Sequence, residues 1–180
     1  VESPELFAAS GRAFGKFQRM LDGYPAETLF ETIPNFHNTE DRLAKLKDAI
    51  EKDVMGRAKD CQAEIDFVMA RQADCSVALD ALRSGILPLR VTHNDTKLNN
   101  ILIDRDTHEG ICVIHLATTM PGLSIHDFGD AIRSYTNTGA EDDRNLDNVE
   151  MSMDMFKAYA EGYLHEQKAS MVQSELDWLA

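Results

Sequence analysis

The sequence changes its hydrophobic period near residue 86, and this change limits the folds that the chain can adopt. Residues 3–85 carry apolar side chains at helical spacing in successive stretches. Residues 86–93, 100–104 and 110–119 are short extended runs, and the polar turn 105–109 between the last two predicts a β-hairpin. Helical spacing returns from about residue 131. The pattern predicts an α+β, mainly helical fold in which helices pack around a short hairpin.

Two glycines stand one helical turn apart in the first predicted helix, which begins after Ser3 and ends before Gly23. Gly11 and Gly15 would face the same side of that helix, where neither has a side chain to hold a neighbour away. We therefore expect the backbone of another element to approach the helix closely at this place.

The charge and composition exclude several classes of protein. The formal net charge is -13, from 18 lysines and arginines against 31 acidic residues, and such a surface repels nucleic acid and anionic lipid. No apolar run approaches the roughly 20 residues of a membrane span, and the first residues do not resemble a signal peptide. The cysteines, Cys61, Cys75 and Cys112, are odd in number and far apart. They predict reduced, buried thiols in a cytoplasmic protein.

The segment "HNDTKLNN" has the spacing of a phosphotransferase catalytic loop. Asp95 precedes Asn100 by five residues, and His93 precedes the aspartate by two. In phosphoryl transfer a carboxylate accepts the proton of the attacking hydroxyl, and an amide oxygen holds a metal that bridges the phosphates. A further metal carboxylate normally follows on the next strand, which the chain reaches through a hairpin.

The segment 110–119 would supply that strand, and its residue types are unexpected. Strand alternation would place Val113, His115 and Ala117 on one face, with Ile114 and Leu116 on the opposite, core face. The face directed at the catalytic loop would then offer an imidazole and a methyl group instead of carboxylates.

Two segments, "LRVTHNDTKLNNILID" and "TTMPGLSIHDFGDAIR", resemble the aminoglycoside phosphotransferase and choline kinase superfamily. With "GRAFGKFQ" and "ETIPNFHNT", the resemblance is closest to the N-acetylhexosamine 1-kinase type. It implies a kinase-like large lobe over residues 1–180 as a single domain, with the small nucleotide-binding lobe absent, from a parent that phosphorylates a sugar hydroxyl with ATP and Mg. By this resemblance Asp95 would be the base, Asn100 a Mg ligand, His93 the residue that orients the loop, and Lys97 a neighbour of the transferred phosphate.

The resembled family carries Asp-Leu-Asp where this chain has His115, Leu116 and Ala117. The change removes the hard oxygen ligands that Mg needs, whereas imidazole suits Zn, Ni, Co or Fe. We therefore expect a divalent transition metal or a small ligand at His115, Asp95 and Asn100. His126 and Asp127 are further candidate ligands, and Ala117 and Tyr135 would line the pocket.

Simpler roles for these residues stay open. His115 could be packed against Asp95 or Asn100, and His126 could be an ordinary loop residue. Asp127, in the "DFG" triplet, matches a structural acid of the resembled family. Tyr135 could cover the surface left by the missing lobe.

Three functions follow from these alternatives. The first is an inactive large lobe whose magnesium site was rebuilt, by engineering, to bind a transition metal or ligand. The second is a fragment of an ATP-dependent amino-sugar 1-kinase. The third is a natural pseudokinase module that associates with itself through its exposed inter-lobe face.

Overall fold

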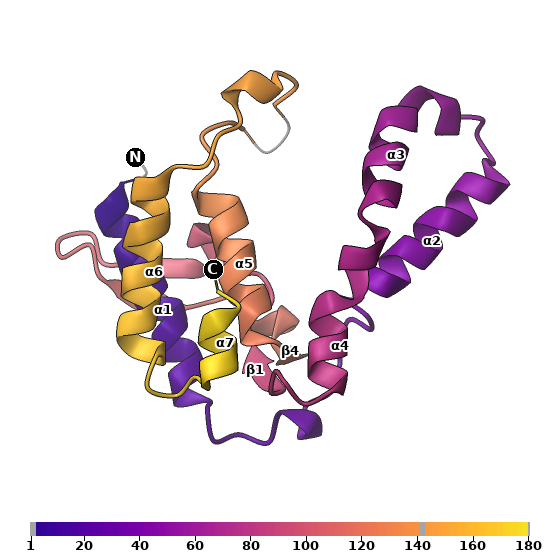
Figure 1. The fold of residues 1–180 in the computed structure, drawn as a ribbon. Coiled ribbons are helices and arrows are strands. Elements are labelled where there is room, and N and C mark those ends of the chain that lie inside the picture. Colours follow the sequence, from indigo (N-terminus) through magenta and orange to yellow (C-terminus); the bar gives the residue numbers. More distant parts are fainter. Residues whose placement is uncertain (1–2, 141–142, 180) are drawn as a thin grey trace. The chain divides into compact units, whose positions relative to one another are not determined.

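A computed structural model describes residues 3–140 and 143–179, which divide into two compact units (Figure 1). The unit of residues 1–32 and 89–180 has these elements: α1 (Pro4–Met20), β1 (Arg90–Thr92), β2 (Ile101–Ile103), β3 (Gly110–Val113), β4 (Met120–Gly122), α5 (Ser124–Tyr135), α6 (Met153–Gln167) and α7 (Gln173–Asp177). The unit of residues 33–88 has α2 (Thr39–Lys52), α3 (Gln62–Ala70) and α4 (Val77–Arg83). The predicted α+β, mainly helical fold is confirmed. No helix in the described ranges is long and apolar enough to cross a membrane.

Helices α1 and α6 cross at glycines, as the sequence predicted for α1. A Cβ atom on Gly15 would lie 2.6 Å from the carbonyl oxygen of Tyr163. One on Gly11 would meet the carbonyl oxygen of Tyr159 more closely still, and one on Gly162 of α6 would meet that of Ala8. Real Cβ atoms essentially never approach other atoms within 3.0 Å, so the crossing requires glycine on both helices.

An aromatic cluster fills the core beside this crossing. The Tyr135 ring stacks on Phe7 with a centroid distance of 5.1 Å, and Phe128 packs against Tyr159 and Tyr163. Burial raises the pKa of both of these tyrosines well above its ordinary value, so both phenols stay protonated. Tyr163 donates its hydroxyl to Gln18 Oε1 at 2.6 Å, whereas the Tyr159 hydroxyl has no hydrogen-bond partner among the described residues.

Loss of the hydroxyl should change the free energy of unfolding in opposite directions at these two tyrosines. Tyr159→Phe removes a buried, unpaired polar group and is expected to raise the free energy of unfolding by about 1 kcal/mol. Tyr163→Phe leaves Gln18 without its donor and is expected to lower it by about 1 kcal/mol. Urea unfolding of the two variants beside the parent measures both changes. Equal destabilisation by both variants would contradict the pairing described here.

Each strand pair is antiparallel and short. β1 pairs with β4 in the register Arg90↔Gly122, and β2 pairs with β3 in the register Ile101↔Val113. The second pair is the predicted hairpin.

The predicted strand 110–119 ends at Val113, so the expected alternation of side chains is wrong. His115 has a φ of 61° and Leu116–Thr118 form a 3-10 turn. Leu116 is 54% exposed and is not a core residue. The peptide group of Ile114 is bonded on both sides, because its N–H donates to Asn100 O at 2.8 Å and its carbonyl oxygen bonds His93 Nε2 at 2.9 Å. These bonds turn the chain out of the strand.

Helix α5 begins at Ser124, seven residues before the expected start near Ala131. Phe128, Ala131 and Tyr135 recur at helical spacing and are buried. The "DFG" triplet therefore lies inside the helix, with Asp127 and Phe128 buried and Gly129 exposed. The cysteines are unpaired as expected, but Cys61 and Cys112 are exposed and not buried.

A buried ion pair connects β1 to α7. Arg90 Nη2 lies 2.6 Å from Glu175 Oε2, and the same carboxylate accepts hydrogen bonds from Ser124 Oγ and the Val172 N–H. Burial alone would raise the pKa of Glu175, but Arg90, Ser124 and the Val172 N–H together hold it below its ordinary value. The ionised carboxylate therefore stabilises the fold.

Acid should remove this stabilisation. Because the folded pKa of Glu175 is lowered, its contribution is present above the unfolded value of about 4.3 and is lost as the pH falls through the folded pKa. Glu175→Gln is expected to cost about 3 kcal/mol at pH 7 and to flatten the loss of stability below pH 4.3. Chemical unfolding from pH 7 to pH 3 tests both. Glu109→Gln, which breaks the exposed pair with Arg12, is the control and should cost under about 1 kcal/mol.

Candidate functional site

Asp127 anchors the loop between β1 and β2, and this residue is only 1% exposed. Its Oδ2 accepts the His93 N–H at 2.8 Å and Gln18 Nε2 at 2.7 Å, and its Oδ1 accepts the Asn94 N–H at 2.7 Å. Burial raises the pKa of Asp127, and these three bonds oppose that rise because they favour the carboxylate. Both oxygens are engaged with protein donors, so the geometry favours the structural role over the role of metal ligand.

His93 fixes the direction of the loop from inside it. Its Nδ1 accepts the Asp95 N–H at 3.2 Å, so Nε2 carries the proton that it donates to Ile114 O. The rings of Phe14 and Phe17 pack against the imidazole in edge-to-face contacts, with centroid distances of 5.3 Å and 5.7 Å. His93 thus joins the loop between β1 and β2 to the end of β3. The orienting role that the resemblance implied stays a prediction.

Asp95 lies at the centre of the exposed part of the site. Asn100 Nδ2 donates to Asp95 Oδ2 at 2.9 Å and to the Asp95 carbonyl oxygen at 2.7 Å. Lys97 Nζ lies 3.6 Å from Asp95 Oδ1. Since Nδ2 makes both amide bonds, Asn100 Oδ1 is the atom left to accept a donor or a hard cation.

His115 comes to the same carboxylate from the end of the hairpin. Its Nδ1 lies 3.1 Å from Asp95 Oδ2, and its side chain is 53% exposed. The left-handed backbone of His115, and not strand alternation, turns the imidazole to Asp95. The sequence left two roles open for His115, that of a metal ligand and that of a residue packed against Asp95 or Asn100. The structure shows the contact with Asp95, although the ring is exposed and not packed.

The remaining candidates lie around this cluster. His126 is half-buried in the first turn of α5, one residue before Asp127. Ala117 is exposed, and its carbonyl oxygen accepts the Thr32 hydroxyl at 3.1 Å. The Tyr135 ring belongs to the aromatic core and also forms part of a pocket with Lys97.

The donors around Asp95 do not suit a magnesium ion. Mg prefers oxygen ligands, and His115 presents a ring nitrogen 3.1 Å from Asp95 Oδ2. For softer metals, the described part of the chain contains no group of three His, Cys, Asp or Glu side chains that could hold an ion. His115 and Asp95 provide two such groups, and the Asn100 amide is the third donor beside them.

Some residues that form the site were not singled out from the sequence. Gln18 is buried and joins α1 to Asp127, and the Thr96 hydroxyl donates to the Asp127 carbonyl oxygen at 2.6 Å. The sequence could have indicated that Gln18 is buried, because this polar residue follows Phe14 by four positions on the buried face of α1. Thr96 gave no signal apart from its place in the loop.

The chain thus has an aspartate and an asparagine five residues apart in a loop before a hairpin, with a buried aspartate beneath the loop. A comparison with protein families gives a match to the phosphotransferase enzyme family over residues 1–168. The matched range includes α1, both strand pairs, the loop that carries Asp95 and Asn100, and α5. This chain therefore belongs to the phosphotransferase enzyme family.

Proposed function

We propose that the chain is a phosphotransferase large lobe that has lost magnesium-dependent phosphoryl transfer at this loop. The proposal rests on the 3.1 Å contact between His115 Nδ1 and Asp95 Oδ2. At this distance the ring nitrogen donates and the carboxylate oxygen accepts, so Nδ1 donates to the oxygen that Asn100 also bonds. A general base must reach the proton of its substrate, and here two donors already occupy Oδ2 while Lys97 is near Oδ1.

The loss of a carboxylate at position 115 is a second reason to expect that phosphoryl transfer is lost. Divalent cations supply much of the charge stabilisation in phosphoryl transfer, and removal of one such contribution costs several kcal/mol of transition-state stabilisation. A reaction deprived of both a free base and a magnesium carboxylate should be slower by many orders of magnitude.

The test is transfer from radiolabelled ATP to amino sugars and neutral sugars in the presence of Mg. We expect no product above the reaction without protein. In the double variant His115→Asp, Ala117→Asp we expect Mg binding to be regained, as measured by calorimetry. Product formed by the parent chain and abolished by Asp95→Asn would contradict the proposal.

A second candidate function is the binding of a transition metal at His115, Asp95 and Asn100. It is favoured by the exposure of His115, which leaves the imidazole accessible to ions, and by the preference of imidazole for Zn, Ni and Co. Calorimetric titration with Zn, Ni, Co and Mg should show binding of the first three that His115→Ala abolishes. The same heats in parent and variant would exclude a site at His115.

A further inference from the structure

An apolar pocket lies between the second half of α1 and strand β3. Side chains from residues 13–20 of α1 form one wall, and residues 110–116 provide the other. The cavity measures about 340 Å³, within the range of roughly 300–1,000 Å³ for sites that hold small molecules. Asp95, Asn100 and His115 do not line it, so this pocket is distinct from the candidate site described above.

The pocket opens beside a contact between two small residues. A Cβ atom on Gly110 would lie 2.9 Å from the Cβ of Ala13, so β3 and α1 touch there. Larger apolar residues of the lining stay open to water, since Met20 is 71% exposed, Ile111 65% and Leu116 54%. A ligand that covered these side chains would remove apolar surface from water, which is favourable.

Lys16 is the charged residue among the described residues that line this pocket. The basic residues before and after it on α1 are paired with acids. Arg12 lies 3.1 Å from Glu109, and Arg19 lies 3.0 Å from Glu166. Within the described part of the chain no acidic side chain pairs with Lys16, although the formal net charge is -13. The exposed ammonium at this pocket is therefore available to an anionic group.

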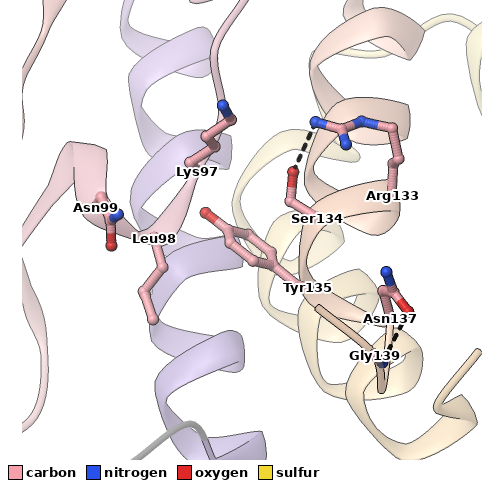
Figure 2. Close-up of a pocket in the computed structure, with 8 residues that line it drawn as sticks. All are labelled: Lys97, Leu98, Asn99, Arg133, Ser134, Tyr135, Asn137 and Gly139. Atoms are coloured by element: carbon pink, nitrogen blue, oxygen red, sulfur yellow. Dashed lines mark hydrogen bonds between the residues drawn. The ribbon is translucent and has the colours of Figure 1, made fainter. Parts of the chain in front are cut away.

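Two other pockets have a less selective arrangement of charge. Figure 2 shows the polar pocket beside Lys97, in which both cations are engaged. Lys97 Nζ lies 3.6 Å from Asp95 Oδ1, and Arg133 donates to Asp130 Oδ1 at 3.0 Å. An apolar pocket in the unit of residues 33–88 is lined by two acidic and two basic residues, so its charges do not favour an anion.

We propose that the pocket between α1 and β3 binds a small amphiphilic carboxylate. The apolar tail would lie against Ile111 and Leu116, and the carboxylate would pair with the Lys16 ammonium. Burial of the tail supplies most of the affinity, because an ion pair at an exposed lysine contributes little. The proposal goes beyond the proposed function, since it requires neither phosphoryl transfer nor a metal.

The experiment is titration of the isotope-labelled chain with octanoate, followed by the amide signals in NMR spectra. Acetate lacks the tail of this probe, and 1-octanol lacks its charge. Lys16→Gln is compared with Lys157→Gln, which removes an exposed lysine of α6 outside the lining. Leu116→Ser is compared with Leu146→Ser, which removes a side chain that is 77% exposed and also outside the lining. Circular dichroism checks that all four variants are folded.

We expect octanoate to shift the amide signals of residues 110–113 and to bind more tightly than either acetate or 1-octanol. Lys16→Gln should weaken octanoate binding about threefold, because an exposed ion pair is lost. Leu116→Ser should weaken it about fivefold, because part of the apolar wall is lost. Each control variant should change the affinity by less than about 1.5-fold.

The proposal is overturned if octanoate leaves the 110–113 amides unshifted, if 1-octanol binds as tightly as octanoate, or if either pocket variant has no larger effect than its control. Shifts confined to residues 46–65 would assign the ligand to the other apolar pocket, and would also overturn it. So would shifts of the 110–113 amides with protein concentration in the absence of octanoate, because these would show that a second copy of the chain covers the pocket.

Discussion

Gly162→Ala is expected to lower the free energy of unfolding by about 3 kcal/mol, which is the upper part of the range for overpacked cores. The added Cβ would overlap the carbonyl oxygen of Ala8 on α1. Backbone atoms inside two packed helices cannot rotate away, so the helices must separate. Separation would also loosen the aromatic cluster, since Tyr159 and Tyr163 are on the same helix and pack beside the crossing.

Gly129→Ala is the matched control for this substitution. Gly129 lies in α5 with its surface exposed, and a Cβ there would meet nothing within 4 Å. Alanine at an exposed helix position is expected to raise stability by roughly 0.5–1 kcal/mol, because glycine loses more backbone entropy on folding. Urea unfolding of both variants gives the comparison. Equal stability of Gly162→Ala and the parent would show that α1 and α6 do not cross at this glycine.

Asp127→Asn should be about as destabilising, by roughly 3 kcal/mol, although it changes a single atom. Three N–H donors converge on the two carboxylate oxygens. An asparagine has one oxygen, and its NH₂ group would face at least one of these buried donors. The N–H groups of His93 and Asn94 belong to the loop between β1 and β2, so this loop should lose its conformation before the rest of the unit does.

Two measurements separate this effect from a general loss of stability. Hydrogen exchange should show reduced protection at the His93 and Asn94 amides in Asp127→Asn. Asp130→Asn, the same substitution one position beyond Gly129, removes a carboxylate that accepts the Thr96 N–H at 3.2 Å and pairs with Arg133. It should cost only about 1 kcal/mol. Unchanged protection at His93 and Asn94 would contradict the anchoring role of Asp127.

The sequence determined those features that depend on near neighbours in the chain. Ser3, after which the first helix was predicted to begin, caps α1, because a cap is made within three residues of the helix start. Gly11 and Gly15 predicted a close backbone approach, because spacing on one helix is set locally. Asp95 and Asn100 are five residues apart in "HNDTKLNN", and the loop brings their side chains into contact.

Tertiary structure decided where the segment 110–119 stops being a strand. It also decided which partners the carboxylates of Asp95 and Asp127 have. The period of apolar residues favoured a continuous strand, but bonds from Asn100 and His93 to Ile114 turn the chain after Val113 and bring His115 to Asp95. Asp127 is fixed by Gln18, 109 residues away in the sequence. Spacing along the chain shows which residues an element can present. Which partner satisfies a buried charge depends on segments that meet only after folding, because burial makes an unpaired charge too costly to leave without donors.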